Sequence, residues 1–431
     1  MRFGGNLKSH FRSPPDSTKE NRAMYVRRHL EKIIYDRSKT YQAVLLTGAR
    51  QVGKSTILEN TVAKDIPQFT LDDLTLRASI KEDMRGFLND NPPPIFIDEI
   101  QYAPELFSGI KMVVDKRKKE DGLYFITGSQ KFELMQGVSE TLSGRIAVLN
   151  LLGFSAREIE QDDFDQPFIP TQEFLSNRKP VGKLDSKELW GRIHRGTMPR
   201  LVTRPTIDWA GYYADYLKTY IERDVQKLTQ VGDTMTFVSF MTVLASRTGQ
   251  LLNIASIARD VGVSEPIIKK WISILEASNI VYVLQPFSLN ITSRAVKTPK
   301  IYFLDTGLAS YLCKWLTPET LQHGAMSGHI FETYVVGEIL KSYYNAGKEP
   351  PIYFYRNDKA EEVDVLFHQD GALYPVEIKK TASPNAKDAS TFKLLSTAFP
   401  SLAIENGGLI CNYDKVVSLG DKIKTIPVNW I

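Results

Sequence analysis

A glycine-rich segment near the N-terminus has the residue types and spacing that bind nucleotide phosphates. Residues 48–55 read Gly-x-x-x-x-Gly-Lys-Ser, after an apolar run at 43–46 and before a segment with helical character at 56–62. The two glycines let backbone N–H groups turn inward at a helix N-terminus, where they form a nest for anions. Lys54 is expected to reach the β- and γ-phosphates of ATP, and the Ser55 hydroxyl to take one position on Mg²⁺. A chance glycine-rich turn would not bring strand, loop and helix together.

Two adjacent carboxylates end another apolar run. The segment 94–101 reads PIFIDEIQ, so Asp98 and Glu99 follow a predicted buried strand. In an open α/β sheet, ligands bind at the carboxyl ends of the strands. Asp98 is expected to bind Mg²⁺ through water, and Glu99 to polarise the water that attacks the γ-phosphate. Many strands simply end in Asp-Glu, but the position downstream of the phosphate loop favours the catalytic interpretation.

Two further segments add candidate groups for ATP hydrolysis. The run 123–126 is a predicted strand followed by Thr-Gly-Ser-Gln, where a short polar side chain can sense the γ-phosphate and position the water. Ser129 is the first candidate and Thr127 the second, although the same residues suit an ordinary turn. Arg145 ends the segment SETLSGR, and an arginine there can stabilise transition-state charge in a neighbouring subunit of a homo-oligomer. The alternative for Arg145 is a surface ion pair.

The last third of the chain carries a second set of charged residues in a regular order. Glu332 lies near the start of a predicted helix, and Asp364, Glu377 and Lys379 lie on the predicted strands 362–368 and 373–380. Glu377 and Lys379 are two residues apart and so share a face of their strand, beside which Asp364 can lie on an antiparallel neighbour. Two carboxylates and a main-chain carbonyl suit a divalent cation, with the lysine near an attacking water. A surface Glu-x-Lys ion pair is the alternative.

The composition is that of a globular protein with several domains. The 431 residues exceed one ordinary core, and 42% hydrophobic with 24% charged residues is typical of a soluble protein. The net charge of +4 does not by itself indicate nucleic acid. The cysteines Cys313 and Cys411 argue against a disulfide scaffold or a zinc finger and fit a reducing cytoplasm. Because no apolar run reaches about 18 residues, we expect no membrane span.

Apolar periodicity predicts the elements that position these groups. Residues 22–38 are expected to form a basic amphipathic helix, and Asp72-Asp73 to cap another helix after a strand at 68–71. Residues 160–187, rich in Asp, Pro, Gln and Lys, have the composition of a connector. Residues 208–230 predict a long amphipathic helix, whose aromatic stripe favours a core position over a base-stacking platform.

A helix-turn-helix pattern follows in the middle of the chain. Residues 237–247, 254–261 and 266–278 predict three helices, with a Gly-Val-Ser turn before the third and a following strand that could form a wing. Lys269 and Lys270 are expected on the exposed face of the third helix, where they could contact the DNA major groove. The alternative is a packing module without DNA contact.

With these residues in view, the chain resembles a prokaryotic family of predicted AAA+ ATPases, in which an ATPase core is joined to a C-terminal module long classed as a domain of unknown function. The resemblance covers residues 27–380 and rests on GARQVGKST, FIDEIQ, TGSQ, LSGR, YIERDVQKL, RTGQLLNIASIARDVGVSEPIIKKWISILE, YFLDTGLA and EEVD…VEIKK. It implies an α/β fold with a P-loop AAA+ parallel sheet, a helical lid, a winged-helix domain and a C-terminal domain similar to PD-(D/E)XK nucleases. The expected divisions are a flexible tail at 1–22, the ATPase core at 23–160, a linker and lid at 161–235, the winged helix at 236–295 and the nuclease-like domain at 296–431.

The resemblance also implies roles for individual residues. Lys54, Ser55, Asp98 and Glu99 match the ATPase motifs, and Arg145 matches the arginine finger. Glu332, Asp364, Glu377 and Lys379 match the nuclease-like set. The full set of predicted nucleotide contacts is Gly48, Ala49, Arg50, Gln51, Val52, Gly53, Lys54, Ser55, Thr56 and, in the lid, Pro199 and Arg200.

We therefore expect a cytoplasmic protein that binds and hydrolyses ATP with Mg²⁺ and releases ADP. Its winged helix and nuclease-like domain would act on DNA. The alternative is a slow nucleotide-dependent regulatory switch or adaptor whose nuclease fold is catalytically inactive. A small-molecule kinase fits less well, because an Asp-Glu pair suits water activation and no acceptor site is evident.

Overall fold

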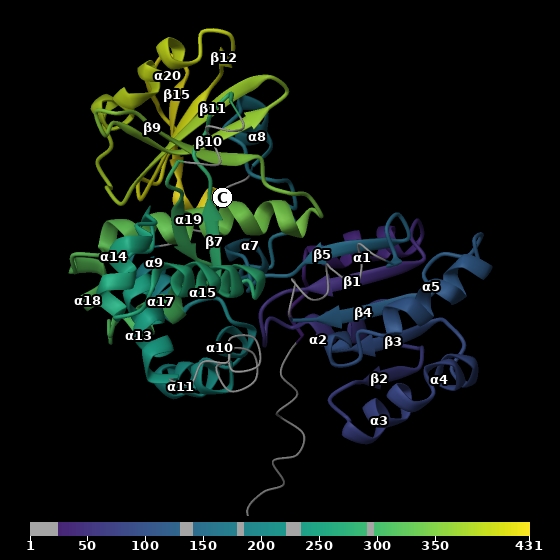
Figure 1. Cartoon of the computed structure of the whole chain (residues 1–431). Helices are drawn as coiled ribbons and strands as arrows, with labels where there is room; N and C mark the ends of the chain where they lie inside the picture. The colour runs from purple at the N-terminus through teal and green to yellow at the C-terminus, as the bar shows by residue number, and fades with distance from the viewer. Residues whose placement is uncertain (1–24, 130–140, 179–184, 221–233, 291–296) are drawn as a thin grey trace, which may run out of the picture.

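The structure is a computed structural model that describes residues 25–129, 141–178, 185–220, 234–290 and 297–431. Figure 1 shows three parts: an N-terminal sheet with its helices, a group of helices around a small sheet, and a C-terminal sheet above a long helix. Within the described ranges, no helix combines the length and the apolar character that crossing a membrane requires.

The N-terminal sheet is parallel and has the strand order β2-β3-β4-β1-β5. Its strands are β1 (Ala43–Thr47), β2 (Gln68–Thr70), β3 (Ile95–Asp98), β4 (Tyr124–Gly128) and β5 (Ile146–Asn150). The helices of this part are α1 (Leu30–Ser38), α2 (Lys54–Asn60), α3 (Leu74–Glu82), α4 (Met84–Asp90), α5 (Leu106–Lys116) and α7 (Ala156–Ile159). Alternate residues of β1 pack with α1 and α2 on one face and with α3, α4 and α5 on the other. The predicted α/β fold with a parallel sheet is confirmed.

The N-terminal helix is shorter than predicted. It begins at Leu30, whereas residues 25–28 have no helical structure, so the predicted start at residue 22 is wrong for the described part. The Arg28 side chain explains the difference, because it is buried and donates to the carbonyl of Val52. Its backbone N–H also donates, at 2.7 Å, to the side chain of Glu31 in the first turn of the helix. Residues 22–24 lie outside the described residues.

The middle part contains helices and a three-stranded antiparallel sheet in the order β6-β8-β7. Its helices are α9 (Ser186–Arg195), α10 (Pro199–Thr203), α11 (Trp209–Tyr220), α13 (Thr234–Ala245), α14 (Ile254–Val261), α15 (Glu265–Ala277), α17 (Thr306–Leu312) and α18 (Pro318–His323). Helix α8 (Gln172–Asn177), which precedes them in the chain, lies beside the C-terminal sheet (Figure 1). The strands are β6 (Gln250–Leu251), β7 (Val281–Leu284) and β8 (Lys300–Phe303). The three helices of the predicted helix-turn-helix pattern are present: α14 has the predicted ends, and the ends of α13 and α15 differ by one to three residues.

Two expectations for the middle part need adjustment. The connector predicted at 160–187 contains α8, which Thr171 caps by accepting from the backbone N–H of Phe174, itself buried. A capping threonine followed by apolar residues explains this short helix. Of the helix predicted at 208–230, Trp209–Tyr220 is helical and the remainder lies outside the described residues. Its tyrosine stripe is buried, as predicted for a core position.

The C-terminal part is a second α/β unit. Its sheet has the order β14-β15-β13-β11-β10-β9, with β12 beside β11. The elements are α19 (Ser327–Asn345), β9 (Ile352–Arg356), β10 (Glu362–Gln369), β11 (Ala372–Lys379), α20 (Lys393–Ala398), β12 (Ala403–Ile404), β13 (Gly407–Cys411), β14 (Ser418–Gly420) and β15 (Ile423–Pro427). Helix α19 lies between this sheet and the middle helices, and nearly all of its side chains are therefore buried (Figure 1).

Candidate functional site

The phosphate loop turns at its two glycines. Gly48 and Gly53 have positive φ values of 155° and 92°. A Cβ atom on Gly48 would lie 2.2 Å from the carbonyl oxygen of Leu151, so a larger residue would force that backbone to move. Lys54 is only 5% exposed, and its Nζ donates to the carbonyl oxygens of Gly48 at 3.1 Å and Ala49 at 3.0 Å. The ammonium group therefore lies within the loop.

The predicted Mg²⁺ residues meet at the carboxyl ends of two neighbouring strands. Asp98 ends β3, Thr127 lies in β4, and Ser55 lies in the first turn of α2. The Ser55 hydroxyl donates to Asp98 Oδ1 at 2.7 Å, and the Thr127 hydroxyl donates to the same oxygen. Hydroxyl and carboxylate oxygens are the ligands that Mg²⁺ prefers, so this donor set fits the ion. The sequence predicts Ser55 and Asp98 for this role and Thr127 for phosphate sensing.

Glu99 is held in an unusual backbone conformation beside this set. Its φ is +59°, in the left-handed region that residues other than glycine seldom adopt. The Glu99 carboxylate accepts hydrogen bonds from the Gln101 amide and, at 3.4 Å, from the Ser129 hydroxyl. The predicted Ser129 therefore does lie beside Glu99. Gln101 was missed, because its spacing alone does not show that residues 100–102 form a tight turn that returns the amide to Glu99.

A cavity of about 470 Å³ opens beside the phosphate loop. Gly53 and Thr56 line one side of it, and Pro199 and Arg200 of α10 line another. Tyr25, in the segment before α1, also contributes to the wall. The structure therefore brings the two lid residues that were predicted to contact nucleotide to the same cavity as the phosphate loop.

Arg28 ties the segment before α1 to the phosphate loop. It is 4% exposed, and its guanidinium group donates to Glu158 at 2.9 Å and to the carbonyl oxygen of Val52 at 3.1 Å. The same group lies 4.6 Å from the centre of the Phe154 ring. The sequence offered no signal that distinguishes Arg28 from Arg27, whose side chain is 75% exposed.

Arg145 forms an ion pair within its own chain. Its Nη2 lies 2.7 Å from Asp115 Oδ1, and its Nη1 donates to the carbonyl oxygen of Ser143 at 3.3 Å. An ion pair of this kind is the alternative to the finger role. The finger role toward a neighbouring subunit stays a prediction.

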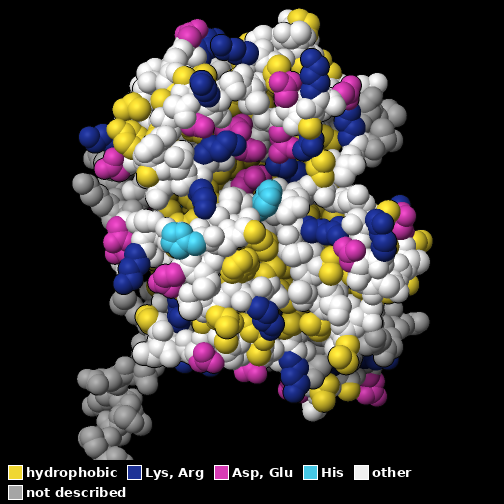
Figure 2. Space-filling view, turned by 90° about the vertical axis from the view of Figure 1, so that its left-hand side faces the viewer, with side chains coloured by type: hydrophobic (Ala, Val, Ile, Leu, Met, Phe, Trp, Pro, Cys, Tyr) yellow, Lys and Arg dark blue, Asp and Glu magenta, His cyan; other side chains and the backbone are white. Residues whose placement is uncertain are grey.

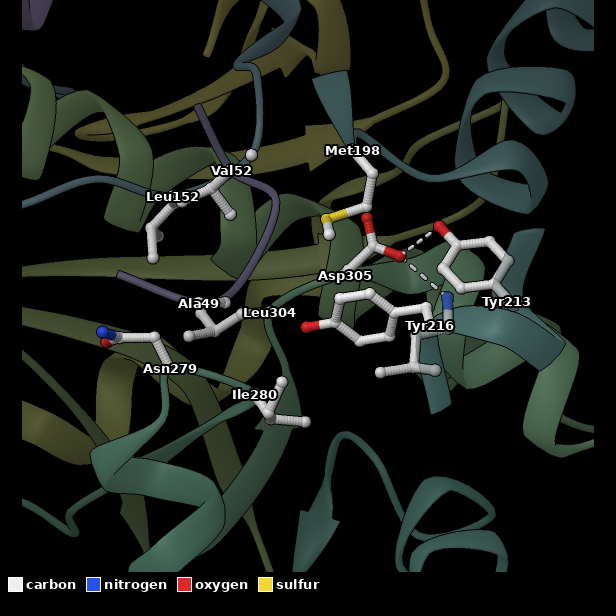
Figure 3. Close-up of a pocket in the computed structure, with 12 residues that line it drawn as sticks. Ala49, Val52, Leu152, Met198, Tyr213, Tyr216, Asn279, Ile280, Leu304 and Asp305 are labelled. Atoms are coloured by element: carbon white, nitrogen blue, oxygen red, sulfur yellow. Dashed lines mark hydrogen bonds between the residues drawn. The ribbon is translucent and has the colours of Figure 1, made fainter. Parts of the chain in front are cut away.

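A second, much smaller cavity of about 20 Å³ lies between the phosphate loop and the middle part (Figure 3). The aliphatic side chains around it are Ala49, Val52, Leu152, Met198, Ile280, Leu304 and Leu308. Asp305 at its edge accepts a hydrogen bond of 2.5 Å from the Tyr213 hydroxyl and one of 2.8 Å from the Leu308 backbone. The loop is therefore packed directly against the middle part. Because close-packed interiors transmit displacements, a shift of the loop would move the side chains of the middle part that contact it.

The C-terminal residues Asp364, Glu377 and Lys379 lie together as predicted. In the antiparallel pair β10–β11, Val365 is opposite Val376, which places Asp364 opposite Glu377. Lys379 Nζ lies 2.6 Å from Glu377 Oε1 and 3.6 Å from Asp364 Oδ2. The strand pairing alone accounts for this cluster.

Glu332 of α19 lies in the same region, but the Lys300 side chain lies between it and Asp364. Lys300 Nζ is 2.8 Å from Glu332 Oε1 and 4.0 Å from Asp364 Oδ1, and it also bonds Glu362. The Tyr302 hydroxyl donates to the same Glu332 oxygen at 2.6 Å. Sequence reasoning missed Lys300, because it precedes the predicted set and has no regular spacing to it. We name Glu332, Glu362, Asp364 and Glu377 the C-terminal acidic cluster.

The surroundings of this cluster raise the pKa of Glu377, Glu332 and Lys300. Burial, together with the Asp364 carboxylate, raises the pKa of Glu377 to about 8. Burial raises the pKa of Glu332 to about 7 although Lys300 acts in the opposite direction. Burial acts to lower the pKa of Lys300, but Tyr302 and the carboxylates outweigh it and hold that pKa well above its usual value. Across the described ranges, no three His, Cys, Asp or Glu side chains are arranged to hold a metal ion.

Comparison with known proteins agrees with this division of the chain. Residues 40–160 match a family described as an AAA domain. Residues 186–319 and 327–431 match two domains of unknown function, DUF8612 and DUF4143. The uncharacterized proteins Rv2008c of Mycobacterium tuberculosis and Mb2031c of Mycobacterium bovis are each 28% identical over 390 residues, which span 90% of this chain and 80% of the relative.

Solved structures also show partial similarity. The Walker-type ATPase PABY2304 of Pyrococcus abyssi aligns with a TM-score of 0.40 and 15% identity, over 66% of this chain and 94% of the other. The RuvB Holliday junction branch migration motor of Thermotoga maritima aligns with a TM-score of 0.28 and 16% identity, over 59% and 88%. On the family matches, this chain joins an AAA domain at residues 40–160, which contains the phosphate loop and the parallel sheet, to a C-terminal DUF4143 module at residues 327–431.

Proposed function

We propose that this chain binds ATP with Mg²⁺ in the cavity beside the phosphate loop and hydrolyses it. The observation that carries the proposal is the hydrogen bond of 2.7 Å between Ser55 and Asp98, since it joins the two ATPase motifs at one point. Lys54, inside the loop, would bind the β- and γ-phosphates. Pro199 and Arg200 would close the cavity on the nucleotide from the lid side.

The roles of the remaining residues follow from their contacts. Ser55 and Asp98 would hold Mg²⁺, which supplies charge neutralisation on the phosphates when it is bound. Glu99 would accept a proton from the attacking water, and Gln101 and Ser129 would orient its carboxylate. Arg145 would stabilise charge on the phosphate bound by a neighbouring subunit.

Phosphate release from purified protein tests this proposal. Lys54→Ala and Glu99→Gln are both expected to reduce release by about 100-fold or more, because each removes a group that acts on the reacting phosphate. Lys64→Ala, at an exposed position after α2, serves as the matched control and should behave like the wild type. Unchanged release in both site variants would refute the assignment.

We also propose that helices α13, α14 and α15 with the small sheet form a winged helix that contacts DNA. Support comes from the exposed Lys269 and Lys270 on α15 and from the antiparallel pairing of β7 with β8. The apolar packing around the small cavity of Figure 3 would couple this unit to the phosphate loop.

For the C-terminal module we propose a nuclease-like fold, and one observation favours the alternative in which it does not cleave. Lys300 is buried within hydrogen-bonding distance of Glu332, in the region where the nuclease prediction needs a divalent ion. The ATPase would then act as a nucleotide-dependent switch or adaptor that holds DNA or another partner. ATP turnover with and without DNA separates the two, because DNA should not stimulate a slow switch.

A further inference from the structure

One buried lysine connects the middle part of the chain with the C-terminal acidic cluster. Lys300 lies in β8, the central strand of the small sheet, opposite Leu251 on one side and Leu284 on the other. Its backbone therefore belongs to the small sheet, whereas its ammonium group bonds Glu332 of α19 and Glu362 of β10. The residue is 3% exposed. Figure 2 shows acidic side chains gathered in a hollow of the molecule with basic side chains beside them.

The ammonium group stands where a divalent ion shared by Glu332, Glu362 and Asp364 would have to lie. It is 2.8 Å from Glu332 Oε1 and 4.0 Å from Asp364 Oδ1, and it also bonds Glu362. An ion held by these carboxylates would need their oxygens at about 2.0–2.6 Å. Two positive charges at such a separation repel strongly in a buried site, where the dielectric response is weak. The ammonium group and a divalent ion therefore exclude each other.

Three other oxygens of the cluster are also engaged. Asp364 Oδ2 accepts from the Ile378 backbone at 2.8 Å, and Glu362 Oε2 lies 3.1 Å from Arg356. Lys379 occupies Glu377 Oε1 at 2.6 Å. Glu377 Oε2 is buried without a hydrogen-bond partner among the described residues, but a single oxygen does not make a metal site. Side chains of the protein itself therefore balance the carboxylates.

We infer that the ammonium group of Lys300 is the resident cation of the C-terminal acidic cluster and takes the position that a divalent ion shared by Glu332, Glu362 and Asp364 would need. The lysine thereby links β8 to α19 and β10 by ion pairs, so the cluster connects the middle part with the C-terminal module. The inference concerns a region remote in sequence from the phosphate loop and does not depend on the ATPase proposal.

Binding of Mn²⁺ to the full-length protein without nucleotide tests the inference. All proteins carry Asp98→Asn, which removes the carboxylate of the Mg²⁺ site proposed beside the phosphate loop. Free Mn²⁺ is measured by electron paramagnetic resonance. The Asp98→Asn protein should leave Mn²⁺ free. Adding Lys300→Ala should create one saturable site per chain, and adding Asp364→Asn to that protein should remove it. Lys359→Ala, at an exposed lysine of the same module, is the control and should create no site.

Thermal unfolding gives a second readout. Mn²⁺ should raise the Tm of the protein that carries Lys300→Ala and leave the Tm of its parent unchanged. Mn²⁺ binding by the parent that disappears with Asp364→Asn would overturn the inference, as would a folded Lys300→Ala protein that takes up no Mn²⁺. If Lys300→Ala prevents folding, the comparison is between the Asp98→Asn protein and the same protein with Asp364→Asn added. Mn²⁺ binding that depends on Asp364 contradicts the inference, and absence of such binding supports it.

Discussion

The hydroxyl group of Ser55 donates a hydrogen bond of 2.7 Å to the carboxylate of Asp98, although the two residues are 43 positions apart in the sequence. One belongs to the phosphate loop and its helix, and the other ends β3 of the same sheet. The parallel order of the strands brings both carboxyl ends to one edge, so the two motifs meet there.

Replacing Arg28 by Ala should destabilise the protein by about 3–5 kcal/mol, because it leaves the buried Glu158 carboxylate without its partner. The same change removes the bond to the carbonyl of Val52 and should weaken ATP binding as well. Urea unfolding measures the first effect. Arg27→Ala is the matched control, since the Arg27 side chain is 75% exposed and should tolerate the change. Equal stability of the two variants would contradict the role given to Arg28.

Arg145→Ala should lower ATP turnover only if Arg145 acts on a neighbouring subunit. Mixing this variant with Lys54→Ala then restores phosphate release, because one partner supplies an intact phosphate loop and the other an intact arginine. Asp115→Ala controls for loss of the ion pair and should keep most activity. A mixture no more active than its components would leave Arg145 as a surface ion pair.

The double change Lys269→Ala and Lys270→Ala should weaken binding of duplex DNA and reduce the salt slope of log K by about 1 to 2, since two phosphate contacts are lost. Fluorescence anisotropy at several salt concentrations measures both quantities. Lys118→Ala with Lys119→Ala removes two exposed lysines from the ATPase core and serves as the control. An equal loss in both proteins would indicate nonspecific charge rather than a winged helix on DNA.

Stability should depend on pH through Glu377. Burial and the Asp364 carboxylate raise the pKa of Glu377 from 4.5 to about 8, so the folded protein binds this proton more tightly than the unfolded chain. The stabilisation is therefore complete below pH 4.5 and is lost as the pH rises toward and through 8. Relative to the wild type, Glu377→Gln should gain in Tm between pH 5.5 and 8.5, roughly the window of this titration. Glu349→Gln, at an exposed position, should show no such trend; a pH-independent difference for Glu377→Gln would count against the shift.

Local patterns were sufficient to predict the parallel sheet and much of both candidate sites. Strand, glycine loop and helix are adjacent in the sequence around Lys54, and the two-residue period of strands places Asp364 beside Glu377. The patterns failed where a side chain acts across the fold. The segment at Arg28 is not helical, and the Arg28 side chain instead makes buried contacts with a loop that is distant in the sequence. Lys300 bonds acidic residues that all follow it in the sequence by 30 residues or more. Such contacts depend on tertiary packing, which periodicity does not encode.

Calorimetric titration of ATP into the Glu99→Gln protein tests the central claim most directly, because hydrolysis is then slow and binding is seen alone. We predict one ATP per chain, tighter binding with Mg²⁺ than without it, and loss of binding when Lys54→Ala is added. A folded Glu99→Gln protein that binds no ATP with or without Mg²⁺ would contradict the account.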